Sequence, residues 1–389
     1  MSKLKVAALQ GLSASSDAIT LANDGTCTAN ITNNLSNRRL TINGDMRIAQ
    51  RGTSTTAEGY LIDRFQGLYG SVDENPTFAQ ADVASGTTPY TLGFRKSLKV
   101  TNGNQTSGAG AADVIGIRHS IEAQDVANSG WNYKSTSSFV TLSFWVKASV
   151  AQNYYGYILS VDGTMQTFPF ETGSLSADTW TKVTVKIPGA ANVDFTNDNG
   201  EGFRIEWRPF TGTDETASGV ALNTWAAFAS GTRMPDNTST WYTTNDATFE
   251  LTGVQLEVGS HSTSYEFKSY AQELALCQRY YYKIKIDTSD SQDSVSIGTG
   301  HQNGAYGVVT CQNPVPMRTK PSITVPTVTD AYSFYYKGTV NRSNTISLSG
   351  NATDTRIELS HTNFSGDDGA AGVMRITNTS AYIEVHSEL

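Results

Sequence analysis

The stretch FVTLSFWVK, residues 139–147, decides the fold, because apolar and polar residues alternate along it. Side chains of an extended strand point to opposite faces in turn. One face of this strand would carry Val140, Leu142, Phe144 and Val146, and the other Thr141, Ser143, Trp145 and Lys147. WTKVTVKIP (180–188) and FRIEW (203–207) repeat the alternation. Several strands with one apolar face each predict a β-sandwich or jelly roll.

The composition supports this fold class. The chain has 389 residues, of which 16% are charged and 10% aromatic, and a disordered chain would be poor in aromatic residues. Asn43-Gly44 and Asn199-Gly200 are turn dipeptides. In TFELTGVQLEVG (248–259) the apolar positions shift by one residue beside Gly253, which predicts a β-bulge. We therefore predict an all-β protein.

Charge and cysteine content exclude several classes of protein. The 28 basic and 36 acidic residues give a net charge of −8, and no basic block is present, which disfavours nucleic-acid binding. Cys27, Cys277 and Cys311 are odd in number and widely spaced, so no disulfide framework or metal-ligand spacing is indicated. No stretch approaches the ~20 apolar residues of a membrane span or the apolar core of a signal peptide. We expect a soluble protein made in a cytoplasm, without membrane insertion.

The chain divides into four predicted regions. Residues 1–35 form a thin arm with strand-like pieces at 5–9, 18–21 and 27–31, too poor in large apolar residues to fold alone; a disordered tail is the alternative. Residues 36–268 form the jelly roll. Ser269 and Gln272 make a capping box that opens a connector helix over 269–285, with Leu274, Cys277 and Tyr281 on one stripe. Residues 286–389 form a small, sandwich-like C-terminal β domain.

Several phrases of the chain are distinctive in combination, among them LTINGDMRIAQRG (40–52), RHSIEAQDVANSGW (118–131), FELTGVQLEVGS (249–260), YAQELALCQRYY (270–281) and PVPMRTKPSITV (314–325). Together they resemble tail-fibre and related virion proteins of bacteriophages. The arm resembles leaders of fibre proteins from phages of aquatic or marine bacteria. The resemblance implies a jelly roll similar to carbohydrate-binding modules, a homotrimer and a receptor-binding surface. It also implies that Trp131 and Trp225 are structural.

The sequence gives little support for catalysis or a cofactor. The five histidines are isolated, and the oxygen-rich segment 194–200 lacks the spacing of an EF-hand loop, so we expect no metal site. The segment GTGHQNG (298–304) departs from the dinucleotide-binding fingerprint by one residue and is predicted to be a loop. A carboxylate pair for glycoside hydrolysis, involving a residue such as Asp162 or Glu171, stays open as an alternative. We predict that the protein is not an enzyme and binds no cofactor.

Aromatic side chains are the strongest candidates for a binding site, because flat rings stack on the C–H face of a sugar. Three clusters stand beside polar residues: Tyr154, Tyr155 and Tyr157; Trp241 and Tyr242; and Tyr332, Tyr335 and Tyr336. The alternative for each cluster is a place in the core or at a trimer seam.

These observations together predict a virion fibre or spike subunit. Its arm would dock onto a phage tail or capsid protein, and the rest would adsorb to a host surface polysaccharide. A purely structural head-decoration or tail-adaptor protein is the second hypothesis, and a polysaccharide depolymerase is the third.

Overall fold

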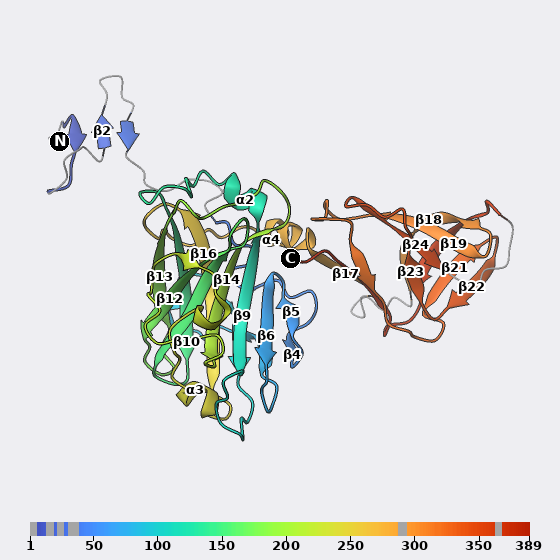
Figure 1. The fold of residues 1–389 in the computed structure, drawn as a ribbon. Coiled ribbons are helices and arrows are strands. Elements are labelled where there is room, and N and C mark those ends of the chain that lie inside the picture. The colour runs from blue at the N-terminus through green and yellow to red at the C-terminus, as the bar shows by residue number, and fades with distance from the viewer. Residues whose placement is uncertain (1–5, 13–18, 22–26, 30–38, 287–293, 362–367) are drawn as a thin grey trace.

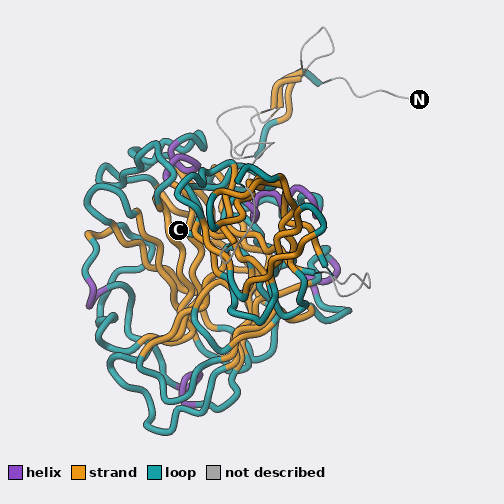
Figure 2. The backbone as a smooth tube through the Cα atoms, turned by 90° about the vertical axis from the view of Figure 1, so that its right-hand side faces the viewer, coloured by secondary structure: helices purple, strands orange, loops and turns teal. Residues whose placement is uncertain are grey.

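The computed structural model describes residues 6–12, 19–21, 27–29, 39–286, 294–361 and 368–389. In chain order it shows a small N-terminal sheet, a large β-sandwich, helix α4 (Tyr270–Gln278) and a distal β domain (Figure 1). Strands make up both large bodies, and the helices are short pieces around them (Figure 2). The fold is all-β, as predicted. In the described part of the chain, no helix is long and apolar enough to cross a bilayer.

The N-terminal arm forms an antiparallel meander of β1 (Ala8–Leu9), β2 (Ile19–Leu21) and β3 (Cys27–Ala29). Each predicted strand-like piece contains one of these strands. The first piece was too long, because residues 6 and 7 precede β1, and residues 5, 18, 30 and 31 lie outside the described residues. The sheet stands away from the sandwich (Figure 1). Four apolar side chains of the arm are exposed: Leu9 and Leu21 in the sheet, and Val6 and Leu12 beside it.

Two antiparallel sheets form the sandwich. The six-stranded sheet has the order β13-β10-β16-β8-β7-β4, and the seven-stranded sheet β15-β12-β11-β14-β9-β6-β5. The strands are β4 (Ser54–Thr55), β5 (Gly59–Ile62), β6 (Phe65–Gly70), β7 (Thr77–Asp82), β8 (Lys96–Thr101), β9 (Val114–Glu122), β10 (Phe139–Ala148), β11 (Asn153–Ser160), β12 (Gln166–Ser174), β13 (Thr181–Pro188), β14 (Glu201–Thr211), β15 (Ala226–Ala227) and β16 (Thr248–Val258). The short helices are α1 (Thr88–Thr91), α2 (Ala123–Ala127), η1 (Ser230–Thr232) and α3 (Thr240–Thr243).

Strand β10 lies between β13 and β16, and its apolar face points into the core. Its four predicted inward residues are fully buried, and Phe144 meets Trp207 of the opposite sheet edge-on at 5.7 Å between ring centroids. The predicted bulge is confirmed, because the β10–β16 register slips between the pairs Ser143–Gln255 and Trp145–Thr252. Gly253 takes the positive φ of +63° at this slip.

Helix α4 begins as predicted and ends earlier. The Ser269 side chain accepts a hydrogen bond from the Gln272 backbone N–H, and the Gln272 side chain accepts one from the Ser269 backbone N–H. The helix ends at Gln278, however, and Tyr281–Lys285 forms strand β17. The predicted helix over 269–285 was therefore too long, because the chain turns after Arg279 to pair with the distal domain.

The distal domain has two antiparallel sheets. The smaller has the order β17-β26-β20, with β26 spanning Tyr382–His386 and β20 Ser322–Thr324. The larger has the order β22-β21-β25-β18-β19-β24-β23. Its strands are β18 (Val295–Asn303), β19 (Tyr306–Gln312), β21 (Tyr332–Tyr336), β22 (Thr339–Ser343), β23 (Ile346–Leu348), β24 (Arg356–His361) and β25 (Ala371–Ile376). The loop predicted at 298–304 is wrong, because residues 298–303 belong to β18 and only the turn at Gly304 lies outside it.

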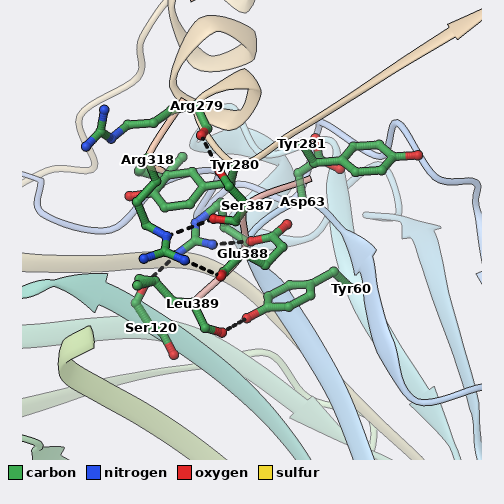
Figure 3. Close-up of polar contacts among 12 residues, drawn as sticks. Tyr60, Asp63, Ser120, Arg279, Tyr280, Tyr281, Arg318, Ser387, Glu388 and Leu389 are labelled. Atoms are coloured by element: carbon green, nitrogen blue, oxygen red, sulfur yellow. Dashed lines mark hydrogen bonds and ion pairs between the residues drawn. The ribbon is translucent and has the colours of Figure 1, made fainter. Parts of the chain in front are cut away.

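A polar junction joins the distal domain to the sandwich (Figure 3). Arg318 donates from Nε to the Ser387 carbonyl at 2.8 Å and from Nη2 to the Glu388 carbonyl at 2.7 Å. The Glu388 carboxylate pairs with Arg51 at 2.9 Å and with Arg64. The Arg64 guanidinium is buried and stacks on Tyr280, 3.5 Å from the ring centroid. The segment after β26 is thus tied to Arg51 and Arg64 of the sandwich by the charge of Glu388.

Candidate functional site

An aromatic-lined pocket of about 800 Å³ lies on the outer face of the six-stranded sheet. Ser143 and Trp145 of β10 and Gly253 of β16 form its base, where side chains point away from the sandwich core. Two loops rise around this base. They contribute Leu92, Phe94, Ser262, Thr263, Ser264, Tyr265 and Phe267, and β13 adds Lys182.

Buried polar residues of β16 hold the loop after that strand against the sheet. The Thr263 backbone N–H donates to Glu257 Oε1 at 2.7 Å, and its hydroxyl donates to Oε2 at 2.7 Å. The Glu266 backbone N–H donates to Gln255 Oε1 at 2.8 Å. Gln255 and Glu257 are outward-facing strand residues, so they bond the loop instead of solvent. This fixes the wall of the pocket above a rigid sheet.

Three aromatic rings form the wall. The Phe94 centroid lies 5.0 Å from Tyr265 and 5.2 Å from Phe267, and Tyr265 lies 4.8 Å from Phe267. The Arg39 guanidinium sits 5.1 Å from the Tyr265 centroid. Burial raises the pKa of Tyr265 well above its usual value, so this hydroxyl stays protonated. Phe267 is 46% exposed and offers a ring face to solvent.

The pocket also carries hydrogen-bonding groups. Lys182 Nζ donates to Ser262 Oγ at 3.3 Å, so a cation and a hydroxyl group line the same pocket as the aromatic rings. Trp145 is half-buried, and its strand neighbours across the sheet are Lys182 and Thr252. Aromatic faces with a few converging polar groups suit a ligand that is apolar on one side and rich in hydroxyls on the other, such as a sugar.

The predicted cluster of Tyr154, Tyr155 and Tyr157 lies inside strand β11. Tyr154 points into the core, where its hydroxyl donates to the Val150 carbonyl at 2.8 Å. Tyr157 points outward but is buried against Met234, and Arg208 Nη2 donates to its hydroxyl at 3.1 Å. Neither ring has a face for a sugar, so the structure corrects both assignments. Tyr155 is half-buried and is the member of this cluster with exposed surface.

Trp241 and Tyr242 are also core residues. Both belong to α3 and are buried; the Trp241 indole N–H donates to the Thr248 carbonyl at 3.0 Å. Tyr242 stacks on Phe210 with 4.3 Å between centroids. The polar residues around this pair suggested a surface site, but the rings close one end of the sandwich. The structure therefore removes both from the candidate sugar contacts.

In the distal domain the three tyrosines separate by strand alternation. Tyr332 and Tyr336 point into the core, and the Tyr332 hydroxyl donates to the Tyr382 carbonyl at 2.8 Å. Both are thus corrected to structural residues. Tyr335 points to the outer face of the sheet and is 41% exposed. Trp131 is buried and Trp225 donates to the Pro188 carbonyl at 2.7 Å, so both occupy structural positions.

The groups weighed for metal binding and hydrolysis have local partners. Asp198 Oδ1 accepts from the Gly200 backbone N–H at 2.8 Å, the geometry of a turn. Glu171 accepts from Asn153 at 2.6 Å, and Asp162 accepts from the Thr196 backbone at 2.9 Å. Within the described ranges, no group of three or more His, Cys, Asp or Glu side chains could hold a metal ion.

Sequence reasoning placed Trp145 on the outer face of its strand but did not select it as a binding residue. The available signal was a single large aromatic residue among the polar positions of an alternating strand. Phe94, Tyr265 and Phe267 carried no comparable signal, because they come from loops that only the folded chain brings together.

No protein-family model and no curated protein matches this chain. Among solved structures it is similar to the enzymatically active domain of tailspike protein 4 of bacteriophage CBA120, with 8% identity, a TM-score of 0.30, and coverage of 57% of this chain and 21% of the tailspike chain. It is also similar to a family 11 carbohydrate-binding module of Clostridium thermocellum, with 12% identity, a TM-score of 0.25, and coverage of 54% and 97%. The N-terminal cellulose-binding domain of Cellulomonas fimi β-1,4-glucanase C gives 13% identity, a TM-score of 0.26, and coverage of 55% and 97%. At such values the function has to be argued from the residues of this chain.

Proposed function

We propose that this chain is a non-catalytic virion fibre or spike subunit, made in the host cytoplasm, that binds a host surface glycan through the aromatic pocket of its sandwich. The observation that carries the proposal is the pocket itself: Trp145 and Phe267 expose ring surface beside Lys182 and a run of hydroxyl groups. The sheet beneath is rigid, and the loop wall is anchored to Glu257. A preformed site of this kind binds without a large ordering cost.

The glycan proposal is tested by titrating purified protein with polysaccharide extracted from the host surface. Trp145→Ala should lower the affinity about 10-fold or more, since each 1.4 kcal/mol of lost contact is a factor of ten. Trp180→Ala is the matched control, because Trp180 is a half-buried tryptophan outside the pocket, beside Lys147. If the wild-type protein binds no host glycan, a purely structural decoration or adaptor role replaces this proposal. Release of reducing ends during the titration would instead favour the depolymerase.

We also propose that the N-terminal arm anchors the subunit in the virion and joins three copies. Its strands are two or three residues long, and its sheet exposes Leu9 and Leu21. Sheets this small are not stable alone in water, so sister chains and a docking protein would share these apolar faces. Removing residues 1–35 should leave a cooperatively melting β protein that no longer enters particles. Normal incorporation of the truncated protein into particles would refute the anchoring role. A stable full-length monomer at micromolar concentration in light scattering would refute the trimer.

A further inference from the structure

A row of arginines crosses the outer face of the large sheet in the distal domain. The strand register places Arg342 opposite Ser333, and Ser333 opposite Arg375. Arg375 of β25 in turn faces Ser296 of β18. Beyond β18 lie β19 and then β24, where Arg356 faces Gln312 of β19. All three arginines are exposed, whereas the residues that flank them along each strand point into the core or the turn. Arg342 and Arg375 are separated by two strand spacings, about 10 Å.

These arginines differ from most arginines of the sandwich in their partners. Arg118, on the outer face of the seven-stranded sheet, pairs with Glu206 at 2.8 Å, and Arg233, at the end of η1, pairs with Glu215 at 2.7 Å. Among the described residues, no carboxylate forms an ion pair with Arg342, Arg356 or Arg375. The carboxylate nearest along the strand to Arg356 is Glu358, which accepts hydrogen bonds from Ser349 and from Asn351, the latter at 2.9 Å. The row therefore keeps its positive charge available to a ligand, in a chain whose net charge is −8.

An exposed tyrosine lies beside the row. Tyr335 is two residues from Ser333 on β21, and the Arg375 guanidinium is 5.6 Å from the centroid of its ring. Val340 and Val373 face Tyr335 from the strands on either side. The ring is thus supported laterally on an open sheet face. It can stack on a sugar ring while Arg375 reaches an acidic substituent.

We propose that this surface, Arg342, Arg356, Arg375 and Tyr335, binds an acidic polysaccharide. Guanidinium groups form paired, charge-assisted hydrogen bonds with carboxylate and sulfate groups, and the neighbouring tyrosine favours a sugar backbone over a simple anion. Spaced cations on a flat face match a polymer that carries anionic groups at intervals. A second copy of the chain is a poor occupant, because two such faces would bring like charges together. The inference rests on the proposed glycan-binding function but uses a different surface from the aromatic pocket.

The experiment measures binding of the full chain to sodium polygalacturonate at low and moderate ionic strength, with neutral dextran as the uncharged control. The variant R342Q/R356Q/R375Q should lose about tenfold or more in affinity, and added salt should weaken wild-type binding. The matched control R95Q/K186Q/K285Q removes the same amount of charge from exposed sites elsewhere and should bind polygalacturonate as the wild type does. Tyr335→Ala should reduce binding to polygalacturonate without changing the salt dependence. Melting curves verify that each variant is folded.

Three outcomes would overturn the inference: equal loss in the two triple variants, equal binding of dextran, or displacement of polygalacturonate by single-stranded DNA at equal charge concentration. The last result would indicate a general polyanion surface. Trp145→Ala separates this inference from the proposed function. This variant should lose affinity for the host glycan and keep its affinity for polygalacturonate, so the two proposed sites are tested by separate measurements.

Discussion

Gly253 shows how one residue sets both a bulge and a pocket. Its φ of +63° is in the left-handed region, and a Cβ there would lie 2.8 Å from Phe94 Cζ and 3.1 Å from Trp145 Cδ1. Gly253→Ala should therefore reduce the free energy of unfolding by about 1–3 kcal/mol, through backbone strain and steric overlap. Gly350→Ala is the control, since a Cβ at Gly350 meets no atom within 4 Å. Denaturant titration of both variants provides the comparison, and equal stabilities would contradict the assigned strain.

Glu206 shows how a buried charge depends on its partners. Burial opposes its ionisation, but Arg208 and Arg118 outweigh burial and lower the pKa of Glu206 from 4.5 to about 2. A carboxylate with a lowered pKa in the folded state contributes stability above pH 4.5, and this contribution is lost as the pH falls toward 2. Glu206→Gln should thus destabilise the protein at pH 7 by about 3–5 kcal/mol, because the buried Arg208 loses its nearest carboxylate and is left with Glu215 at 3.8 Å.

The pH dependence supplies the check on that prediction. Urea titrations between pH 2 and pH 7 should show the stability difference between wild type and Glu206→Gln closing progressively from pH 4.5 toward pH 2, because the carboxyl is protonated near pH 4.5 in the unfolded chain and only near pH 2 in the folded protein. A difference that stays constant over this range would mean that packing, and not charge, explains the loss. Glu171→Gln, at a half-buried carboxylate bonded to Asn153, is the control variant.

Residue identity alone predicted the aromatic sites poorly, for a physical reason. Large rings are the residues with the most to gain from burial, so a cluster of them indicates a core as readily as a binding face. Strand alternation alone predicts that the Tyr154 side chain points into the core and that the Tyr335 side chain points to solvent, and the structure shows both orientations. Tyr157 lies on the outer face as well, but residues around Met234 cover it. No local pattern near residue 157 foretells a covering loop more than 70 positions away.

At the scale of elements, strands with clean alternation were predictable, whereas strand β18, with glycines at 298 and 300, was not. Strand β10 has the boundaries that its alternation predicted, to within a residue. Strand β18 was missed because Gly298 and Gly300 suggest a loop. The structure gives the reason for Gly300: a Cβ there would lie 1.8 Å from the Val308 carbonyl oxygen of the paired strand. Gly300 lets the two strands approach closely. In the sequence, a glycine with this role cannot be distinguished from a glycine in a turn.

The start of α4 gives a prediction for an element. Ser269→Ala removes the hydrogen bond from the Ser269 side chain to the Gln272 backbone N–H and should cost about 0.5–2 kcal/mol in the free energy of unfolding. Gln272→Ala removes the reciprocal bond, so the double variant should lose less than the sum of the two single variants. Denaturant titration of all three measures the coupling. Gln278→Ala, at the last helical residue, is the control and should change stability by a few tenths of a kcal/mol at most.

At the scale of the whole molecule, the sequence indicated successive β regions and a helix between them but not how they are held together. The junction depends on residues far apart in the chain: Tyr60 donates to the Leu389 carbonyl at 2.9 Å, and Arg279 pairs with Glu122 at 2.7 Å. Arg318 adds a bond to the Asn199 carbonyl at 2.9 Å. Such pairings leave no local pattern in the sequence, because the sequence around an arginine does not show whether that arginine is buried or exposed. They couple the distal domain to the sandwich without a continuous apolar interface.

Glu388 is the residue through which that coupling can be tested. Its carboxylate neutralises Arg64, which is buried, and Arg51, which is partly buried, so Glu388→Gln leaves a buried guanidinium without its anion. Removing one partner of a buried pair costs about 3–5 kcal/mol, whereas a surface pair contributes about 0–1 kcal/mol. Glu384→Gln is the matched control, because Glu384 pairs with Lys283 within the distal domain. In calorimetry the wild type and the control should melt in the same way, and Glu388→Gln should melt earlier, with the distal domain separating into its own transition. Unchanged melting of Glu388→Gln would show that the ion pairs of Glu388 do not stabilise the junction, and that its other hydrogen bonds are sufficient to hold the two bodies together.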